Sequence, residues 1–233
     1  MKKPTLLLVQ TGSVAEPAVK AAHGDYPAWF ERAFAGAAEL RVLRAHEGEK
    51  IRDGLDGIVV TGSPLSVTER APWMDELGQA LFEQGRRGTP VLGVCFGHQL
   101  LCRAAGGEVV KNPRGREIGT VEVELTEAGR RDPLFAWAAA PRVAVQATHL
   151  DAVDPLPRSA TVLAGNENTP AQAVRFSEAV AAVQFHPELD PATLRALVEA
   201  RREKLRAEGI DVPSVRETES RRILLAFADQ CRK

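Results

Sequence analysis

The fold of this chain is organised by the stretch Pro90-Val91-Leu92-Gly93-Val94-Cys95-Phe96-Gly97-His98-Gln99-Leu100-Leu101. A short apolar run ends in Gly-Val-Cys-Phe-Gly and passes directly into a segment compatible with a helix. Small residues around Cys95 allow the backbone to turn sharply, so the pattern predicts a strand, a tight turn that exposes the cysteine, and a helix. The N-terminal N–H groups and the positive dipole end of that helix would favour the thiolate. The stretch alone is equally compatible with a buried cysteine that closes a core strand.

Upstream of this turn, short apolar runs alternate with helical periodicity. The predicted strands are residues 5–9, 40–43 and 57–60, and the predicted helices are residues 26–34 and 72–83. This alternation predicts an α/β fold with a mostly parallel central sheet flanked by helices. Because sites in such sheets lie beyond the carboxyl ends of the strands, Gly62 and Cys95 are expected at the same edge.

Downstream of residue 106, short strands predict a smaller antiparallel portion of the fold. The expected strands are residues 120–125, 142–146, 161–164, 171–175 and 180–184. Asp190-Pro191 predicts the start of a helix that ends at Gly209, and residues 214–217 resemble a capping box that opens a last helix. We therefore expect one domain over residues 1–189 and a helical C-terminal extension over residues 190–233 packed on the same domain. Its charged residues, Arg201 to Lys204, are expected to form a solvated face.

Composition limits the possible functions. A hydrophobic content of 44% and a charged content of 26% are ordinary for a globular protein. The net charge of −1 gives no basic excess for a nucleic-acid partner, and the N-terminal apolar run is too short for a signal peptide or a membrane span. The three cysteines form no CxxC pair, so a reducing cytoplasm is expected, with Cys102 and Cys231 as packing residues.

A cysteine nucleophile needs a base, and the base needs a residue that orients it. Of the five histidines, His186 is the best candidate because it lies in Phe185-His186-Pro187-Glu188 after a predicted strand. In an extended backbone His186 and Glu188 can lie on one side, where the carboxylate would fix the imidazole tautomer. A solvent-facing turn is the alternative interpretation of this motif alone. Residues expected to play no part as the base are His23, His46 and His98.

Together, residues 93–101 and 184–188 resemble the class I (triad) glutamine amidotransferases, and the likeness covers about residues 6–188. Thr61-Gly62-Ser63-Pro64 resembles the loop that donates an oxyanion-hole amide in that family. Thr148-His149-Leu150-Asp151 resembles the segment that lines its glutamine pocket. Residues 115–119, Gly-Arg-Glu-Ile-Gly, are similar to the stand-alone GMP-synthetase-like glutaminase branch. The resemblance implies the flavodoxin-like fold of the family.

The resemblance also implies roles for individual residues. Cys95 would attack the side-chain amide of glutamine, His186 would transfer the proton, and Glu188 would orient His186. The main-chain N–H groups of Gly62 and Phe96 would bind the oxyanion. No metal or organic cofactor is implied, and the histidines and cysteines lack zinc-site spacing. The implied substrate-binding residues are Gln99, Thr148, His149 and Leu150.

Three functions remain open from the sequence. The first is hydrolysis of glutamine to glutamate and ammonia, either alone or for a synthetase partner, because the chain contains no GxxxxGK[ST] phosphate loop. The second is hydrolysis of a γ-glutamyl peptide or γ-glutamyl amine by the same triad. The third, of a different class, is a non-catalytic regulator or redox sensor that carries a reactive cysteine on the same fold.

Overall fold

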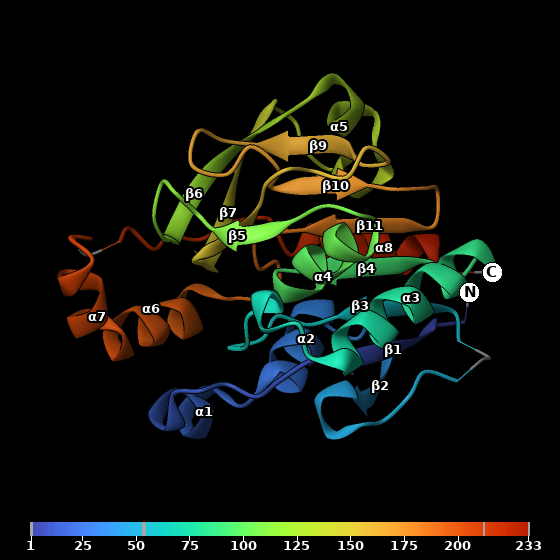
Figure 1. The fold of residues 1–233 in the computed structure, drawn as a ribbon, viewed down its shortest axis with the longest axis horizontal. Coiled ribbons are helices and arrows are strands. Elements are labelled where there is room, and N and C mark those ends of the chain that lie inside the picture. Colours follow the sequence, from blue (N-terminus) through green and yellow to red (C-terminus); the bar gives the residue numbers. More distant parts are fainter. Residues whose placement is uncertain (1, 53–54, 212, 233) are drawn as a thin grey trace.

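A twisted sheet crosses the whole molecule in the computed structural model, which describes residues 2–52, 55–211 and 213–232 (Figure 1). Its strands are β1 (Thr5–Gln10), β2 (Glu39–Arg44), β3 (Gly57–Val60), β4 (Val91–Val94), β6 (Glu117–Leu125), β7 (Arg142–His149), β9 (Thr161–Gly165), β10 (Ala173–Arg175) and β11 (Val180–Val183). Among the described residues these nine strands are ordered β2-β1-β3-β4-β11-β10-β9-β6-β7. A separate ribbon pairs β5 (Val109–Lys111) with β8 (Asp151–Val153).

The sheet is parallel in one part and antiparallel in the other. The pairs β1–β2, β1–β3, β3–β4 and β4–β11 are parallel. The pairs β10–β11, β9–β10, β6–β9 and β6–β7 are antiparallel. The predicted α/β fold class, a mostly parallel sheet with a smaller antiparallel portion, is therefore confirmed.

Helices cover both faces of the sheet (Figure 1). The α-helices are α1 (Pro17–His23), α2 (Tyr26–Phe34), α3 (Pro72–Arg86), α4 (Phe96–Ala104), α5 (Glu127–Arg131), α6 (Pro191–Ala200), α7 (Arg202–Ala207) and α8 (Arg222–Gln230). Single 3-10 turns occur at η1 (Ala45–Glu47), η2 (Val67–Glu69) and η3 (Pro133–Phe135). In the described part of the chain, no helix combines the length and apolar character that crossing a membrane requires.

Burial on both faces explains why the parallel strands are apolar without alternation. In β1, Leu6 and Leu8 pack into the core shared with α2 and α8, whereas Leu7 and Val9 pack into the core shared with α3 and α4. Successive side chains of a strand point to opposite faces, so every position must be apolar when both faces are covered. A third cluster joins α2 to α6 through residues such as Trp29 and Leu194.

The C-terminal extension differs from the prediction in two places. The helix expected from Pro191 to Gly209 is interrupted at Arg201 (φ −103°, ψ 7°), which separates α6 from α7. The last helix begins at Arg222 and not at residues 214–217. Instead of capping a helix, Ser214 accepts a hydrogen bond from the Thr120 backbone at 2.7 Å, and the Arg216 N–H donates to the Thr120 hydroxyl at 2.9 Å. Pairing with β6 thus outweighs the local helix signal.

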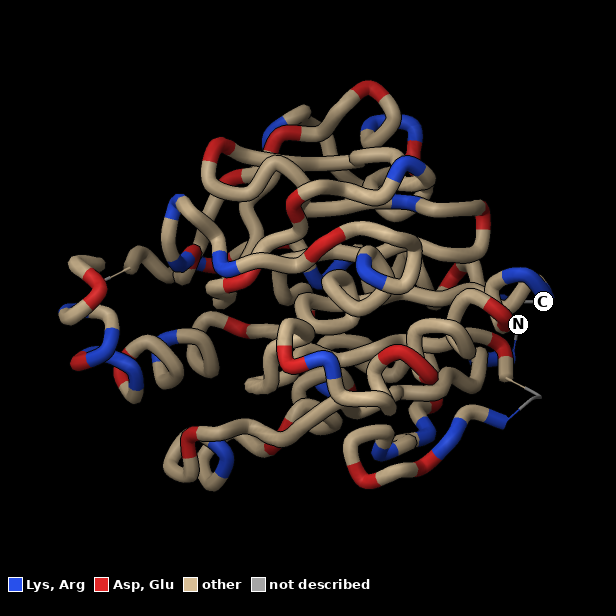
Figure 2. The backbone as a smooth tube through the Cα atoms, viewed as in Figure 1, with Lys and Arg blue, Asp and Glu red and all other residues tan. Residues whose placement is uncertain are grey.

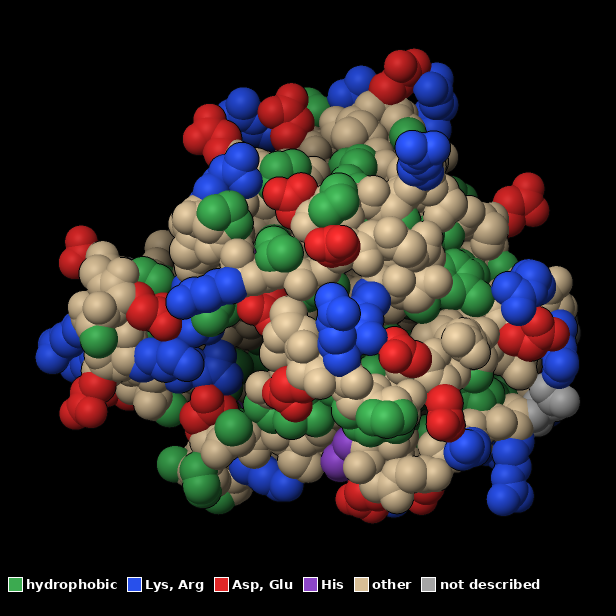
Figure 3. All heavy atoms as spheres, viewed as in Figure 1, with side chains coloured by type: hydrophobic (Ala, Val, Ile, Leu, Met, Phe, Trp, Pro, Cys, Tyr) green, Lys and Arg blue, Asp and Glu red, His purple; other side chains and the backbone are tan. Residues whose placement is uncertain are grey.

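Charges are mixed along this extension and over the surface. Figure 2 shows basic and acidic residues interspersed along α6 and α7. Figure 3 shows the same mixture of side chains over the face in view. Among the described residues, the α-helices and strands that were not predicted are α1, β5, α5 and β8, and the three 3-10 turns were not predicted either. Each is short, so its periodicity carries little signal.

Phe227→Ala is expected to destabilise the fold by about 3–5 kcal/mol, because the Phe227 ring of α8 is buried in the core that covers the sheet. Leu225→Ala is the matched control on the same helix. Leu225 is only half-buried, so the loss should be about 1 kcal/mol or less. Urea unfolding followed by circular dichroism measures both. Equal midpoints for the two variants would contradict this role of α8 in the core.

Candidate active site

The turn between β4 and α4 holds Cys95 in a strained conformation. Its φ of 51° lies in the left-handed region that non-glycine residues avoid. The flanking glycines permit this turn because a Cβ on Gly93 would lie 2.6 Å from the Gly97 carbonyl oxygen. A Cβ on Gly97 would lie 2.9 Å from the carbonyl oxygen of Val60. The predicted tight strand-to-helix turn is therefore present, with Cys95 directly before the first residue of α4. The predicted exposure of the cysteine is wrong, because Cys95 is only 7% exposed.

His186 and Glu188 lie beside Cys95 because β11 runs parallel to β4. The register pairs Val183 with Val94, so the segment after β11 emerges at the same edge as the Cys95 turn. His186 Nδ1 lies 2.7 Å from Glu188 Oε1, and both residues are buried. The Nε2 atom of His186 makes no hydrogen bond to the described residues. This leaves one ring nitrogen fixed by a carboxylate and the other available for proton transfer.

Burial and the neighbouring charges shift the pKa of His186 in opposite directions. Burial lowers the pKa because it disfavours the charged ring. The charges of Glu188 and Cys95 outweigh that effect and raise the pKa to about 10. An imidazole with this pKa readily holds a proton taken from a thiol, which is a property of ion-paired catalytic cysteines.

Gly62 follows β3 and borders the same side chains. A Cβ at Gly62 would lie 2.8 Å from His186 Cε1 and 3.6 Å from Cys95 Cβ. The Gly62 carbonyl accepts hydrogen bonds from the hydroxyls of Thr11 at 3.0 Å and Thr61 at 2.8 Å, which fixes the orientation of the loop. Phe96 is the first residue of α4, so its N–H has no partner within the helix. Both positions can supply main-chain donors near the sulfur.

These elements border a cavity of about 570 Å³. Cys95, Phe96, Gln99 and His186 line it. The predicted Thr148-His149-Leu150-Asp151 segment at the end of β7 forms another part of its wall, where the Asp151 carbonyl accepts a hydrogen bond from Gln99 Nε2 at 3.1 Å. The structure thus brings together every predicted site residue at the cavity, apart from Gly62 and Glu188, which do not line it. Gly62 lies against Cys95 and His186, and Glu188 contacts His186 Nδ1.

The remaining histidines and cysteines lie elsewhere. Burial, followed by the charge of His149, lowers the pKa of His98 to about 3, so its ring is neutral. His98 is one of the buried residues of α4. Neither His23 nor His46 lines the cavity. Burial raises the pKa of both other thiols, that of Cys231 to about 12, which keeps them protonated. Among the described residues, no cluster of three or more His, Cys, Asp or Glu side chains could hold a metal ion.

Sequence reasoning did not place several further residues in the site that line the cavity, among them Glu16, Tyr26, Trp29, Lys111, Arg116, Arg201 and Lys204. Tyr26 and Trp29 project from α2, where their aromatic character indicated only a core position. Arg201 was expected on a solvated face, but its Nε donates to Glu16 Oε1 at 2.6 Å and an Nη donates to the Thr148 hydroxyl at 2.6 Å. The interruption between α6 and α7 places this guanidinium between two walls of the cavity. No local sequence signal distinguishes Arg201 from its charged neighbours.

The sequence of the chain matches a known protein family and several of its members. The class-I glutamine amidotransferase family model matches residues 31–201. A GMP synthase [glutamine-hydrolyzing] from Aeropyrum pernix is 37% identical over 133 residues, which are 57% of this chain and 24% of that protein. The match therefore spans about a quarter of the length of that relative. Gamma-glutamyl peptidase 5 from Arabidopsis thaliana is 29% identical over 187 residues, which are 78% of this chain and 74% of that protein.

A solved structure resembles the fold over nearly its whole length. The crystal structure of a glutamine amidotransferase from Thermotoga maritima superposes with a TM-score of 0.75 over 99% of both chains, at 22% sequence identity. At this identity the likeness establishes the fold alone.

His186→Gln is expected to lose more stability at neutral than at alkaline pH. The pKa of about 10 in the folded protein exceeds the ordinary value of 6.5. The stabilisation from the charged ring is therefore complete below pH 6.5, declines above it, and is lost as the pH rises through about 10. Urea midpoints of the wild type and the variant should converge progressively between neutral pH and that value. A constant difference would contradict the charged His186–Glu188 pair.

Proposed function

The chain belongs to the class-I glutamine amidotransferase family, and on that premise we propose that it hydrolyses the γ-amide of glutamine through Cys95, His186 and Glu188. The observation that carries the proposal is the position of Cys95, on a strained turn at one cavity with the hydrogen-bonded His186–Glu188 pair. A nucleophile, a base and a residue that orients the base are the minimum set for covalent catalysis by a thiol.

In the proposed acylation step, His186 Nε2 takes the proton of the Cys95 thiol. The sulfur attacks the δ-carbon of glutamine, and the carbonyl oxygen becomes an oxyanion that the Gly62 and Phe96 N–H groups stabilise. Each such donor typically contributes about 10²–10³ in rate. The carbon–nitrogen bond then breaks while His186 returns the proton to the nitrogen. The products of this step are ammonia and a γ-glutamyl thioester on Cys95.

In the proposed deacylation step, a water molecule takes the place of the ammonia that has left. His186 removes a proton from the water, whose oxygen attacks the thioester carbonyl, and the carbon–sulfur bond breaks. The thiolate recovers its proton from His186 and glutamate leaves. Glu188 remains ionised throughout, since its role is to hold the Nδ1–H of His186 and to stabilise the imidazolium. Gln99 and the residues Thr148, His149 and Leu150 bind the α-amino and α-carboxylate groups of the substrate.

A specific observation supports a second candidate, hydrolysis of γ-glutamyl peptides or γ-glutamyl amines. The cavity of about 570 Å³ lies in the range that holds drug-sized ligands, which exceed glutamine in size. A relative that this chain matches over 74% of its length is named gamma-glutamyl peptidase 5. The same triad would act, with an amine in place of ammonia as the leaving group.

We further propose the setting in which the reaction takes place. A synthetase that consumes ammonia is the partner suggested by the GMP synthase relatives. Residues 1–189 act as the amidotransferase domain and residues 190–233 as an extension packed on it, because Phe227 joins the core and Arg201 reaches the cavity. A reducing cytoplasm suits a nucleophile that must stay a free thiol.

Cys95→Ala is expected to lower glutamine hydrolysis by at least about 10³-fold, because the thioester cannot form. Cys102→Ala is the matched control, since Cys102 lies on the following helix outside the cavity and should retain activity. Coupled detection of glutamate measures both variants, and mass spectrometry of the protein treated with a glutamine-analogue electrophile locates the label. Retained turnover in Cys95→Ala, or a label elsewhere, would refute the proposal.

Substrate choice separates the two candidate reactions. We expect kcat/KM for glutamine to exceed that for γ-glutamyl-glycine, because the predicted pocket contacts are all made to the glutamyl part. Ammonia and free glycine are measured with the purified chain under identical conditions. Faster release of glycine than of ammonia would assign the protein to the peptidase reaction.

A further inference from the structure

A second carboxylate–imidazole pair is buried beside the cavity. Glu117, the first residue of β6, is 7% exposed, and His149 of β7 is 4% exposed. The strand register places the two residues opposite each other, and Glu117 Oε2 lies 3.0 Å from His149 Nε2. His149 lines the cavity, whereas Glu117 does not. Glu117 can therefore influence a substrate only through its neighbours.

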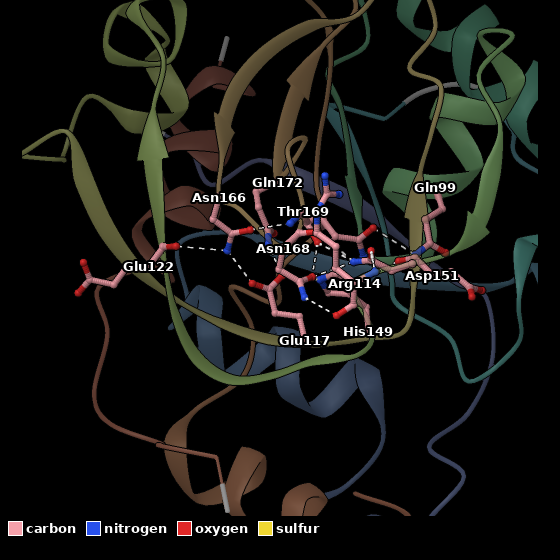
Figure 4. Close-up of polar contacts among 12 residues, drawn as sticks. Gln99, Arg114, Glu117, Glu122, His149, Asp151, Asn166, Asn168, Thr169 and Gln172 are labelled. Carbon is pink, nitrogen blue, oxygen red and sulfur yellow. Dashed lines mark hydrogen bonds and ion pairs between the residues drawn. The ribbon is translucent and has the colours of Figure 1, made fainter. Parts of the chain in front are cut away.

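Glu117 is held as a carboxylate by several donors (Figure 4). Besides His149, the amide of Gln172 donates to Oε2 at 2.5 Å, and the amide of Asn166 donates to Oε1 at 2.6 Å. Burial raises the pKa of Glu117, but the hydrogen bonds from His149, Asn166 and Gln172 outweigh it, so the pKa falls below its ordinary value. A buried carboxylate is tolerated only with this degree of pairing.

The surroundings of His149 define its charge state. Its second ring nitrogen, Nδ1, lies 3.1 Å from the main-chain carbonyl oxygen of Asp151. A carbonyl and an ionised carboxylate can only accept hydrogen bonds, so both ring nitrogens must donate. Both donate together only in the imidazolium form.

The network continues from His149 to the helix that follows the nucleophile. The Asp151 carbonyl that faces His149 also accepts a hydrogen bond from Gln99 Nε2 at 3.1 Å. The Gln99 N–H in turn donates to the Cys95 carbonyl at 3.0 Å in the first turn of α4. One chain of contacts thus joins Glu117, His149, Asp151 and Gln99 to Cys95. All of these residues except Glu117 line the cavity.

We propose that Glu117 is a positioning residue that holds His149 as an imidazolium and thereby gives the Thr148–Asp151 wall the positive charge that selects substrates carrying an α-carboxylate. The inference rests on the proposed function for the identity of the substrate, but it concerns binding and not bond cleavage. It also gives a physical role to the Gly-Arg-Glu-Ile-Gly segment at residues 115–119, whose glutamate contacts neither Cys95 nor the cavity.

Glu117→Gln tests this role, because it keeps the shape of the side chain and removes its charge. The KM for glutamine is expected to rise at least about tenfold, while kcat stays within about threefold, the pattern of lost ground-state binding. The matched control is Glu122→Gln on the same strand, where the carboxylate pairs with Arg216 at 2.8 Å on the surface. The control should keep the wild-type KM.

A substrate without the charge distinguishes positioning from general packing. Glutamine α-amide retains the scissile γ-amide but lacks the α-carboxylate. Wild-type protein should prefer glutamine over the α-amide by at least about tenfold in kcat/KM, and Glu117→Gln should lose most of that preference. Glu117→Asp, which keeps the charge, should recover part of it. An unchanged preference in Glu117→Gln, or a fall in kcat with KM unchanged, would overturn the proposal.

Protection of Cys95 from iodoacetamide separates this inference from the proposed function. Iodoacetamide carries no charge, so its reaction with Cys95 in the absence of glutamine should be equal in the wild type and in Glu117→Gln. Glutamine should protect Glu117→Gln at least about tenfold less effectively. Wild-type protein that is protected but does not hydrolyse glutamine would refute the proposed function alone, whereas equal protection of both proteins would refute the role of Glu117 alone. If Glu117→Gln does not fold, His149→Gln removes the charge from the other side of the pair, and loss of the preference for glutamine over its α-amide is the expected result.

Discussion

The backbone strain at Cys95 depends on the central parallel strands around it. A non-glycine residue at a φ of 51° costs about 1–3 kcal/mol and persists only where the surrounding structure enforces that conformation. Here β4 is paired with β3 on one side and β11 on the other, and α4 packs directly after the turn. The strained turn places the Cys95 sulfur beyond the end of the sheet, before the chain continues into helix α4.

The same strands determine which residues meet the sulfur. β3, β4 and β11 are adjacent and parallel in the sheet, although they come from residues 57–60, 91–94 and 180–183. Their carboxyl ends therefore bring Gly62, Cys95 and His186 to one edge. Burial on both faces fixes the strand positions, and the positions of the strand ends fix the site. The geometry of the site therefore depends on the packing of the two hydrophobic cores.

Features encoded within a few residues were predictable from the sequence. The glycines around Cys95 indicated the turn. Pro187 between His186 and Glu188 indicated an extended unit, which is wrong, because Pro187 and Glu188 form a turn in which the Leu189 N–H donates to the His186 carbonyl at 3.3 Å, although the two side chains do meet as expected. Arg201 was not predictable, because its contacts with Glu16 and Thr148 depend on where two distant loops lie. The capping pattern at residues 214–217 indicated a helix that does not begin there. The local helix preference of this segment is weaker than its pairing with β6, which the sequence does not show.

Two buried carboxylate–imidazole pairs border the cavity, and the difference between them lies at the second ring nitrogen. In His186 that nitrogen has no hydrogen-bond partner among the described residues and lies beside Cys95, so the ring can gain and lose a proton during a reaction. In His149 the equivalent position is occupied by the Asp151 carbonyl, so the ring has nowhere to deliver a proton. One pair is thus suited to proton transfer and the other to a permanent charge. Sequence alone shows two histidines near strand ends with similar neighbours, and only the placement of a single acceptor atom separates their chemistry.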